Sequence, residues 1–412
     1  MHLCFVSRKF PPTLSGMSTW ALNYCREMAG RGHRVTVLAQ YRPEAAAGSA
    51  YGDAPPAPLA GVDVRGVPQR HEVERGDFES DVDELVRRIV EIDRERRVDL
   101  VHAQFAYPPG VAAVRAAAAL GRPAVVSVQG GDGHWFGTCC GQHFRVMQGL
   151  LGAASASVFP TGSFRAMVEE RYGPVARGRV IPGAVDTSVF RRTGEARRRW
   201  RERLGVAGAT LVVLFHGRID RRKGVFELLE AWRSLPAPVR AACRLVLAGS
   251  GPDDAEAGRA VAALPAGEAS WLGRLPYEEM PGLLSAADLH CSPTHREGFS
   301  NTLVEAAACA LPLLATDAVG VRDVFTDGET ARLVPPGDPP ALAAAIAELA
   351  GSAALRDRLA RGALGLVRER FSWKRTGDAF ETLYGEVGAA SAPPPPEPGD
   401  PACRFRANPL LL

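Results

Sequence analysis

The sequence predicts an α/β protein of two domains, each built on a doubly wound parallel sheet. Its 412 residues are enough for two separate hydrophobic cores. Apolar runs rich in β-branched residues, such as residues 124–128 and 210–215, are typical of buried parallel strands. A strand at residues 3–7 is followed by a Gly-containing loop and a helix over 20–31, which is the order of a Rossmann-like unit.

The remaining elements alternate along the chain in the same way. Strands are predicted at residues 35–39, 99–102, 156–160, 244–248, 288–291 and 331–334, and helices at 81–97, 340–350 and 354–369. A helix is also expected after Thr161. Residues 41–61 are rich in Ala, Pro and Gly and are expected to form a loop.

Composition excludes several classes of protein. The 46% apolar and 23% charged residues fit a soluble globular protein, and a net charge of +3 does not call for nucleic acid. No apolar run approaches the roughly 18 residues of a membrane span, and no signal peptide is recognised, so we expect a cytoplasmic protein. Seven Arg against two Glu between Arg191 and Arg203 indicate a solvated helix face, with peripheral contact at the inner membrane face as the alternative.

Residues 293–317 concentrate the features of a ligand site. Turn residues end the strand at 288–291, and a helix begins near Asn301. The backbone N–H groups of Ser300, Asn301 and Thr302 carry partial positive charge at this helix start and suit a phosphate. Glu297 lies in the turn and Glu305 lies one turn into the helix. Two carboxylates on either side of an anion-binding helix end could hold the hydroxyls at the two ends of a sugar nucleotide.

The spacing Glu297-x7-Glu305 within REGFSNTLVEAAACALPLLATD resembles the signature of the family 4 glycosyltransferases, which have the GT-B fold. The similarity continues along most of the chain. It implies that Glu297 contacts the transferred sugar and that Glu305 contacts the nucleotide ribose. It also implies two Rossmann-like domains facing across a cleft. The implied domains are an acceptor domain at 1–186 and a nucleotide-sugar domain at 210–370, joined by a connection at 187–209. A closing helix at 371–388 is expected to cross back to the first domain, and a Pro-rich tail at 389–412 is expected to be disordered.

Three further segments of the second domain match the family. Arg218 and Lys223 in HGRIDRRKG resemble the cations that bind the donor diphosphate, and with a helix end they could replace a divalent metal. Gly251 resembles the family's GxGP near the nucleotide, whereas Pro252 breaks the glycine pattern of a nicotinamide oxidoreductase. Leu272 resembles the strand edge that receives the base.

Four residues of the first domain are candidates for the acceptor side. Gly16 would let backbone N–H groups approach a diphosphate or acceptor, with a plain left-handed turn as the alternative. Gln129 stands where many relatives carry His; it can hydrogen-bond but cannot titrate near neutral pH. Asp132 matches the family's GxD and is expected to contact the acceptor or sugar, unless it caps the next segment. His102 is expected to be a packed strand-end histidine, with a role as acid or base as the alternative.

The cysteine pattern does not predict a metal. The eight Cys are scattered without a repeated CxxC pair, which fits thiols in a reducing compartment. Cys139, Cys140, His143 and His134 gather in one stretch, but adjacent cysteines are awkward ligands for one tetrahedral ion. No metal site is therefore expected.

The resemblance implies glycosyl transfer with retention, from a UDP- or GDP-linked sugar to a hydroxyl on a glycan, a lipid-linked glycan or a small molecule. No cofactor is required beyond the nucleotide sugar, which is a co-substrate. Arg218, Lys223 and the helix-start amides would stabilise the β-phosphate, while Glu297 orients the sugar. A sugar-nucleotide-binding protein without transfer activity is the alternative, because Gln129 departs from the family pattern.

Overall fold

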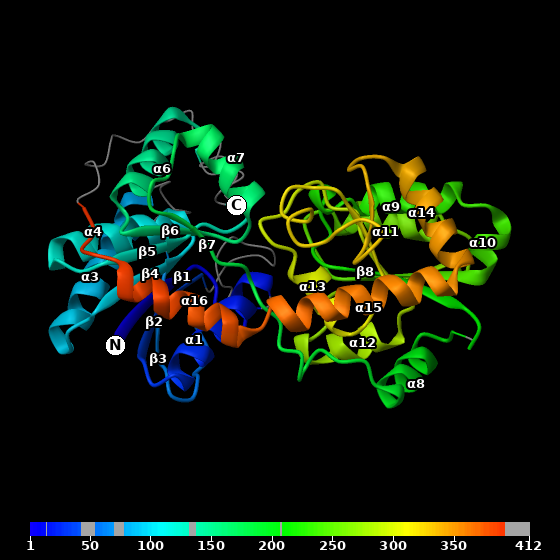
Figure 1. The fold of residues 1–412 in the computed structure, drawn as a ribbon, viewed down its shortest axis with the longest axis horizontal. Coiled ribbons are helices and arrows are strands. Elements are labelled where there is room, and N and C mark those ends of the chain that lie inside the picture. The colour runs from blue at the N-terminus through cyan, green and yellow to red at the C-terminus, as the bar shows by residue number, and fades with distance from the viewer. Residues whose placement is uncertain (14, 43–53, 70–77, 132–136, 207, 392–412) are drawn as a thin grey trace. The chain divides into compact units, whose positions relative to one another are not determined.

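The computed structural model describes residues 1–13, 15–42, 54–69, 78–131, 137–206 and 208–391. The chain divides into two compact units (Figure 1). The first holds Met1–Gly183 with Trp373–Leu412, and the second holds Ala184–Ser372. Asp132, most of the predicted loop at 41–61 and nearly all of the predicted tail lie outside the described residues.

A parallel sheet of seven strands forms the centre of the first unit, as far as it is described, in the order β3-β2-β1-β4-β5-β6-β7. The strands are β1 (His2–Ser7), β2 (Arg34–Tyr41), β3 (Asp63–Pro68), β4 (Leu100–Gln104), β5 (Ala124–Ser127), β6 (Ala156–Phe159) and β7 (Gly178–Val180). The helical segments are α1 (Gly16–Gly30), α3 (Phe78–Glu95), η1 (Ala106–Gly110), α4 (Val111–Leu120), α6 (Gly141–Ala153), α7 (Gly162–Tyr172) and α16 (Trp373–Glu386). The order reverses between β1 and β4, which makes the sheet doubly wound and confirms the predicted fold class.

Helices α1 and α16 cover one face of this sheet together (Figure 1). Phe380 of α16 packs among Trp20, Tyr24 and Phe5, so the end of the chain contributes to the core of its beginning. Arg31 at the end of α1 also pairs with Glu381 at 2.5 Å. The expected return of the last helix to the first domain is therefore observed.

His102 lies on the same face and is completely buried. Its Nδ1 is 2.9 Å from the Tyr24 hydroxyl and 2.7 Å from the Tyr384 hydroxyl, and its Nε2 is 2.8 Å from the Ser127 hydroxyl. Burial lowers the pKa of His102 to about 3. A neutral, fully packed histidine fits the structural role that the sequence predicted.

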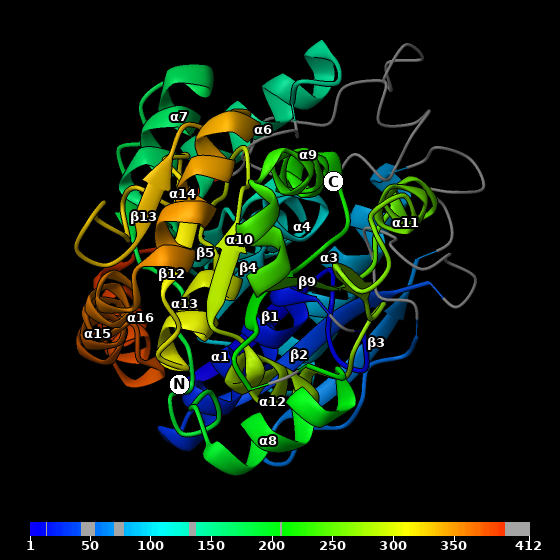
Figure 2. The ribbon, with the colours of Figure 1, turned by 90° about the vertical axis from the view of Figure 1, so that its right-hand side faces the viewer.

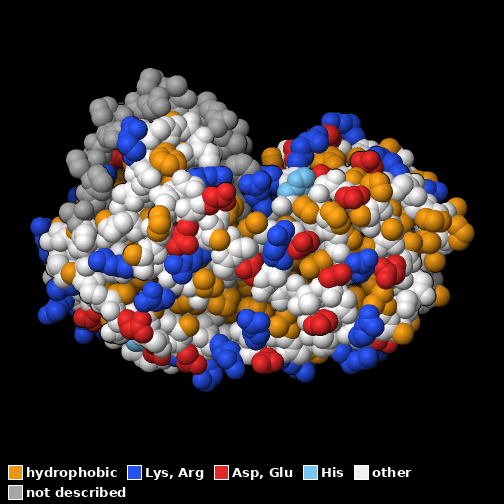
Figure 3. Space-filling model, turned by 45° about the horizontal axis from the view of Figure 1, so that its top comes forward, with side chains coloured by type: hydrophobic (Ala, Val, Ile, Leu, Met, Phe, Trp, Pro, Cys, Tyr) orange, Lys and Arg blue, Asp and Glu red, His pale blue; other side chains and the backbone are white. Residues whose placement is uncertain are grey.

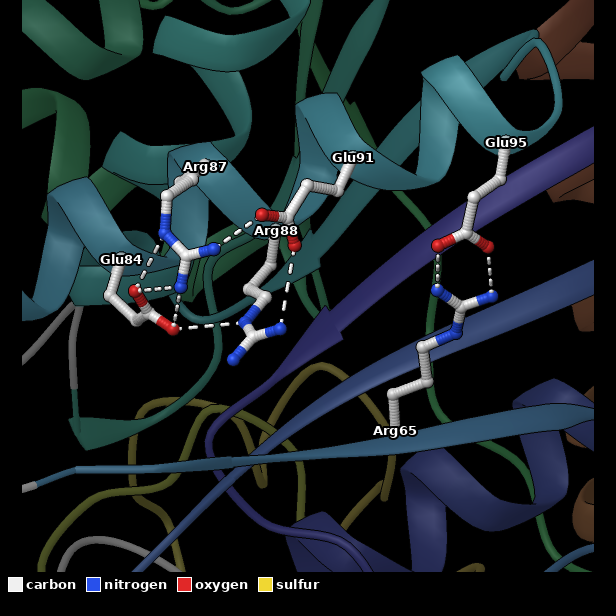
Figure 4. A network of polar contacts seen from close by, with 6 residues as sticks. All are labelled: Arg65, Glu84, Arg87, Arg88, Glu91 and Glu95. Carbon is white, nitrogen blue, oxygen red and sulfur yellow. Dashed lines mark hydrogen bonds and ion pairs between the residues drawn. The ribbon is translucent and has the colours of Figure 1, made fainter.

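The edge strand β3 was missed by the sequence prediction. Its Asp-Val-Arg-Gly-Val-Pro run contains charged, Gly and Pro residues that disfavour strands, which edge strands nevertheless tolerate. Figure 4 shows how Arg65 of β3 binds both carboxylate oxygens of Glu95, at 2.9 and 2.7 Å, at the end of α3. Earlier in α3, Arg87 and Arg88 pair with Glu84 and Glu91 at helical spacings of three and four. These exposed pairs make the surfaces of β3 and of α3 polar.

The second unit repeats the architecture with six described parallel strands in the order β10-β9-β8-β11-β12-β13. They are β8 (Leu211–His216), β9 (Cys243–Ala248), β10 (Ala269–Trp271), β11 (Leu289–Ser292), β12 (Leu313–Thr316) and β13 (Arg332–Val334). The helical segments are α8 (Gly194–Arg203), η2 (Arg221–Lys223), α9 (Val225–Ser234), α10 (Ala237–Ala242), α11 (Asp254–Ala262), η3 (Tyr277–Glu279), α12 (Met280–Ala286), α13 (Asn301–Ala308), α14 (Pro339–Gly351) and α15 (Ala353–Arg370).

Side-chain alternation along β8 explains the two helical layers of this unit. Val213 and Phe215 pack with α9, α11 and α14, whereas Val212 and Leu214 pack with α8, α12, α13 and α15. Figures 1 and 2 show these helices on the two sides of the strands. Burial on both faces is what the continuous apolar run at 210–215 predicted.

The predicted connection at 187–209 contains α8, whose arginines largely serve the fold. Arg197 and Arg201 donate to Ala286 O and pair with Asp288 at 2.6 and 2.9 Å, so they cap the carboxyl end of α12. Arg192 also donates to Ala287 O. Because these three arginines bind groups of the protein itself, fewer side chains of the cluster are available to a membrane than the sequence suggested. Peripheral membrane contact stays a prediction.

No helix in the described part of the chain is both long and apolar enough to cross a membrane. On the face drawn in Figure 3, acidic and basic side chains are intermixed rather than separated by sign. This agrees with the near-neutral composition of the chain. Intermixed charges do not create an extended electrostatic potential of one sign on that face.

Candidate functional site

Four loops of the second unit that follow strands carry most of the residues predicted for the site, and a fifth holds one of these residues in place. β8 and β11 are neighbours where the strand order reverses, the position at which open α/β sheets bind ligands. Arg218 and Lys223 follow β8, while Glu297 and the start of α13 follow β11. Gly251 follows β9 and Leu272 follows β10. The loop after β12 completes the set by holding Glu297 in place.

The predicted sugar contact and one predicted diphosphate contact touch each other directly. Lys223 Nζ donates to Glu297 Oε1 at 2.5 Å. Glu297 is largely buried, whereas Lys223 is about one-third exposed. The main chain of Glu297 is held by the loop after β12, because Glu297 N donates to Val319 O at 2.9 Å. The structure thus places a cation beside the carboxylate, at the edge of the sheet where a ligand would bind.

Close backbone packing joins the loops after β8 and β11. A Cβ atom on Gly224 would lie 1.9 Å from Pro293 O, so only glycine permits this approach. His295 N donates to Arg222 O at 3.0 Å across the same junction. Nearer to β8, a Cβ atom on Gly217 would lie 4.0 Å from Thr302 Cγ2, which puts the chain beside Arg218 against the first turn of α13.

Gly251 has a structural reason that is independent of any ligand. A Cβ atom there would lie 2.0 Å from Ile219 O, so the glycine lets the loop after β9 pack on the loop after β8. Gly251 N donates to Asp254 Oδ1 at 2.7 Å, which begins α11. Leu272 lies directly beyond β10 and donates its N–H to Leu247 O at 2.9 Å. Contact of either residue with a nucleotide stays a prediction.

Helix α13 begins at Asn301, as the sequence predicted. Ser300 is the N-terminal cap residue, but its side chain makes no capping hydrogen bond to the helix backbone. Instead, its hydroxyl lies 3.2 Å from the hydroxyl of Thr302. The first turn therefore presents hydroxyl and amide groups at the positive end of the helix.

Arg218 is the second predicted diphosphate cation, and its charge is only loosely compensated. Its Nε is 3.6 Å from Asp220 Oδ2, while Arg222 binds the same carboxylate at 2.5 Å. Burial lowers the pKa of Arg218, although a guanidinium remains protonated in proteins. The Arg222–Asp220 pair lowers the pKa of Asp220 despite its burial. Asp220 caps η2 and so positions the turn that carries Lys223.

Glu305, the predicted ribose contact, is held in a buried polar chain. Tyr277 donates its hydroxyl to Glu305 Oε1 at 3.2 Å, and His216 Nε2 lies 3.2 Å from Glu305 Oε2. His216 Nδ1 in turn lies 2.9 Å from Nε2 of His290, which is completely buried. Burial, together with the nearby His216, lowers the pKa of His290. A neutral His290 that donates to His216 leaves His216 Nε2 free to donate to Glu305.

Sequence reasoning missed His216, Tyr277 and His290. His216 and His290 end or interrupt apolar strands and so resembled core positions. Tyr277 lies 28 positions before Glu305, with no shared motif. Burial raises the pKa of Tyr277, and the Glu305 carboxylate raises it further, so the hydroxyl is a stable proton donor. Only the fold brings these side chains to the carboxylate.

The first unit has its own polar cluster at the carboxyl ends of β1, β4 and β5. Gln104 Nε2 donates to Gln129 Oε1 at 3.1 Å and to Met17 O at 3.0 Å. Ser7 donates to Gln104 Oε1 at 2.6 Å. Gly16 is exposed as the first residue of α1, behind a capping box formed by Ser15 and Ser18. Gln104 thus links Gln129 to Met17, the residue after Gly16, while Asp132 is not described.

Two family models match the chain, one on each unit. A model described as "Glycosyltransferase Family 4" matches residues 14–189, and a model described as "Glycosyl transferases group 1" matches residues 196–364. Together they cover most of the sequence. The second match contains Arg218, Lys223, Glu297 and Glu305.

Individual relatives and solved structures agree with these matches. A Bacillus subtilis glycosyltransferase named for teichuronic acid biosynthesis is 28% identical over 72% of this chain and 73% of its own. A D-inositol 3-phosphate glycosyltransferase of Geodermatophilus obscurus is 35% identical over 55% of this chain and 52% of its own. Several other curated relatives also match over about half of their length. The solved structure of Anabaena HepE in complex with UDP has a TM-score of 0.75 and 19% identity, covering 94% of this chain and 100% of that one.

Proposed function

Because the chain belongs to the family 4 glycosyltransferases, whose co-substrates are nucleotide sugars, we propose that it transfers a sugar from a UDP- or GDP-linked donor to a hydroxyl acceptor. The acceptor is a glycan, a lipid-linked glycan or a small molecule, and the anomeric configuration is retained. One observation supports this above all. The loops after β8 and β11 bring Lys223 and Glu297 into contact and set Gly217, next to Arg218, against the start of α13.

The charges of this site suit the departure of a diphosphate. When the bond between the anomeric carbon and the β-phosphate oxygen breaks, negative charge grows on the phosphate and positive character grows on the sugar ring. Arg218, Lys223 and the first-turn amides of α13 would stabilise the phosphate more in the transition state than in the bound donor. In this proposal these cations balance the diphosphate without a divalent metal ion.

The carboxylates take different parts in the same step. Glu297, whose carboxylate is already oriented by Lys223, would bind hydroxyls of the transferred sugar. Glu305, oriented by Tyr277 and His216, would bind the ribose hydroxyls. The acceptor oxygen attacks the face that the phosphate leaves, and its proton passes to the departing phosphate. Because the phosphate takes this proton, the step needs no titratable histidine at position 129.

A donor screen followed by a product assay tests the proposal. The purified chain is heated with a panel of UDP- and GDP-sugars, and a donor at 100 times its Kd should add about 2.7 kcal/mol of apparent stability. The stabilising donor is then incubated with candidate acceptors, and the anomeric configuration of the product is determined by NMR. We expect release of the nucleoside diphosphate together with a product of retained configuration.

The same assay separates transfer from mere binding. A chain that is stabilised by a donor but never hydrolyses or transfers it, with any acceptor offered, would be the binding protein that Gln129 suggests. A product of inverted configuration would contradict the retaining mechanism. Absence of stabilisation by every nucleotide sugar would overturn the proposed substrate class.

A further inference from the structure

Three metal-ligand side chains meet at the start of α6 in the first unit. Cys139 Sγ lies 3.1 Å from His143 Nδ1, and Cys140 Sγ lies 3.4 Å from the same nitrogen. All three ligand atoms lie within 4.8 Å of one another. Adjacent cysteines were expected to be awkward ligands, but the helix start turns both sulfurs toward one imidazole.

The two sulfur–nitrogen distances are close to those of a tetrahedral zinc site. With Zn–S bonds of about 2.3 Å and a Zn–N bond of about 2.0 Å, tetrahedral angles put sulfur about 3.5 Å from nitrogen and the sulfurs about 3.8 Å apart. The two observed sulfur–nitrogen distances depart from this by only a few tenths of an ångström. Small rotations of the side chains would therefore admit the ion.

Both sulfurs approach the same imidazole nitrogen, and Cys140 Sγ also accepts from His143 N at 3.5 Å as the cap of the helix. A single cation between the three atoms would interact with both sulfurs and with the nitrogen at once. Cys140 is also the N-terminal cap of α6, where the positive helix end favours the thiolate that binds metals.

The remaining described cysteines show how unusual this pair is in the chain. Cys4, Cys25, Cys243, Cys291 and Cys309 are buried, whereas Cys139 and Cys140 are half-buried. Burial raises the pKa of Cys4 and of Cys309 to about 12, which makes them unreactive. His143 is itself buried and packs on Tyr107, with ring centroids 5.3 Å apart, so its ring is held in place.

We propose that Cys139, Cys140 and His143 of the first unit bind one zinc ion, whereas the proposed donor-binding loops belong to the second unit. Three protein ligands leave a fourth tetrahedral position for water or another group. The ligands lie just before and within the first turn of α6, so the ion would fix the start of that helix. It takes no part in the proposed charge balance at the diphosphate.

Metal content and spectroscopy of the full-length chain test this site without an activity assay. The reduced protein, freed of any affinity tag, is incubated with Zn²⁺, dialysed and analysed for metal. We expect about one tightly bound zinc per chain, lost in Cys139→Ser and in His143→Gln. Cys243→Ser, which removes a thiol from the other unit, is the matched control and should keep the full zinc content. With Co²⁺ instead, the wild type should show the absorption bands of a tetrahedral thiolate complex, and both ligand variants should lack them.

X-ray absorption of the zinc-loaded wild type covers the case in which a variant does not fold. The proposal requires two sulfur neighbours at about 2.3 Å and at least one nitrogen at about 2.0 Å. A wild type that retains no zinc overturns the proposal, as does a ligand variant that retains the wild-type amount. So does a sulfur-free zinc shell, or a Cys139–Cys140 disulfide that persists under reducing conditions.

Discussion

At the scale of single residues, the contact between Lys223 and Glu297 is the feature with the most consequences. In the free protein, the ammonium already neutralises a largely buried carboxylate. A donor that enters this site exchanges part of that pairing for contacts with its phosphate and its sugar. The cation and the carboxylate should therefore act together, and their effects on turnover should not add.

We expect Lys223→Ala and Arg218→Ala each to lower turnover by about 100-fold or more, the usual loss when one donor to a developing oxyanion is removed. Arg221→Ala is the matched control. Arg221 lies in the same turn, but it is exposed, pairs with Glu256 and covers Phe226, so its loss should leave turnover nearly unchanged. Steady-state kinetics on folded variants measures this. Equal losses in all three variants, or none, would contradict the assignment.

A second residue-scale prediction concerns acid stability. The pKa of His102 is about 3 in the folded chain and about 6.5 in the unfolded chain. Between these values the unfolded chain binds a proton that the folded chain does not. The free energy of unfolding should therefore fall as the pH falls below about 6.5, by up to about 1.4 kcal/mol per pH unit from this group. Above about pH 6.5 the contribution is fully present and constant.

Urea unfolding of the wild type and of His102→Gln, from pH 7.5 down to 4.5, isolates this contribution. Glutamine can still hydrogen-bond to Tyr24, Tyr384 or Ser127 but cannot titrate. We expect the variant to be less stable at pH 7.5 and to lose less stability on acidification. His290 is present in both proteins and cancels in the comparison. If the free energies of unfolding of the two proteins changed in parallel with pH, the pKa of His102 would not differ between the folded and unfolded chains, which would contradict the prediction.

At the scale of elements, the junction between η2 and the end of β11 depends on one glycine. Gly224 has a φ of 72° and meets Pro293 O, so any side chain there is both strained and obstructed. We expect Gly224→Ala to lower the free energy of unfolding by about 3 kcal/mol or more. Gly328→Ala is the control, because Gly328 has a φ of 74° with open space around it and should cost only about 1 kcal/mol. Similar losses in denaturant unfolding would mean that the contact with Pro293 is not rigid.

Elements were predictable from the sequence where local signals were strong. Asn301 was predicted as the start of α13 because turn residues precede a helical apolar pattern, and Thr161 was recognised as a cap. The edge strand β3 was missed because charged and turn-forming residues hide it. Helix α1 begins before the predicted position because Ser15 and Ser18 cap each other across the glycine.

The candidate site was predictable as a set of motifs but not as a geometry. Glu297, Lys223 and Glu305 each stand out by spacing or charge, yet nothing local indicates that the first two pair. The orientation of Glu305 by His216 and Tyr277 depends on which strands and helices are neighbours. Long-range contacts of this kind appear only when the sheet order is known.

At the scale of the whole molecule, Phe371 and Phe380 belong to different units, although they are only nine positions apart. Phe371 is buried against Phe299 in the second unit, and its carbonyl accepts from Val185 N. Phe380 is buried among the aromatic residues of α1 in the first unit. The end of the chain thus contributes to two separate cores within a few helical turns.

Truncating either ring should therefore destabilise one unit and spare the other. We expect Phe380→Ala to cost about 3–5 kcal/mol, because the cavity beside Trp20 and Tyr24 cannot close. Hydrogen exchange followed by mass spectrometry should show faster exchange in β1, α1 and α16, with β8 and α9 unchanged. Phe371→Ala should give the converse pattern, with faster exchange in α13 and α15 and little change in β1. If both variants loosened both units equally, the two cores would be one cooperative unit, and the separate assignment of these neighbouring phenylalanines would be wrong.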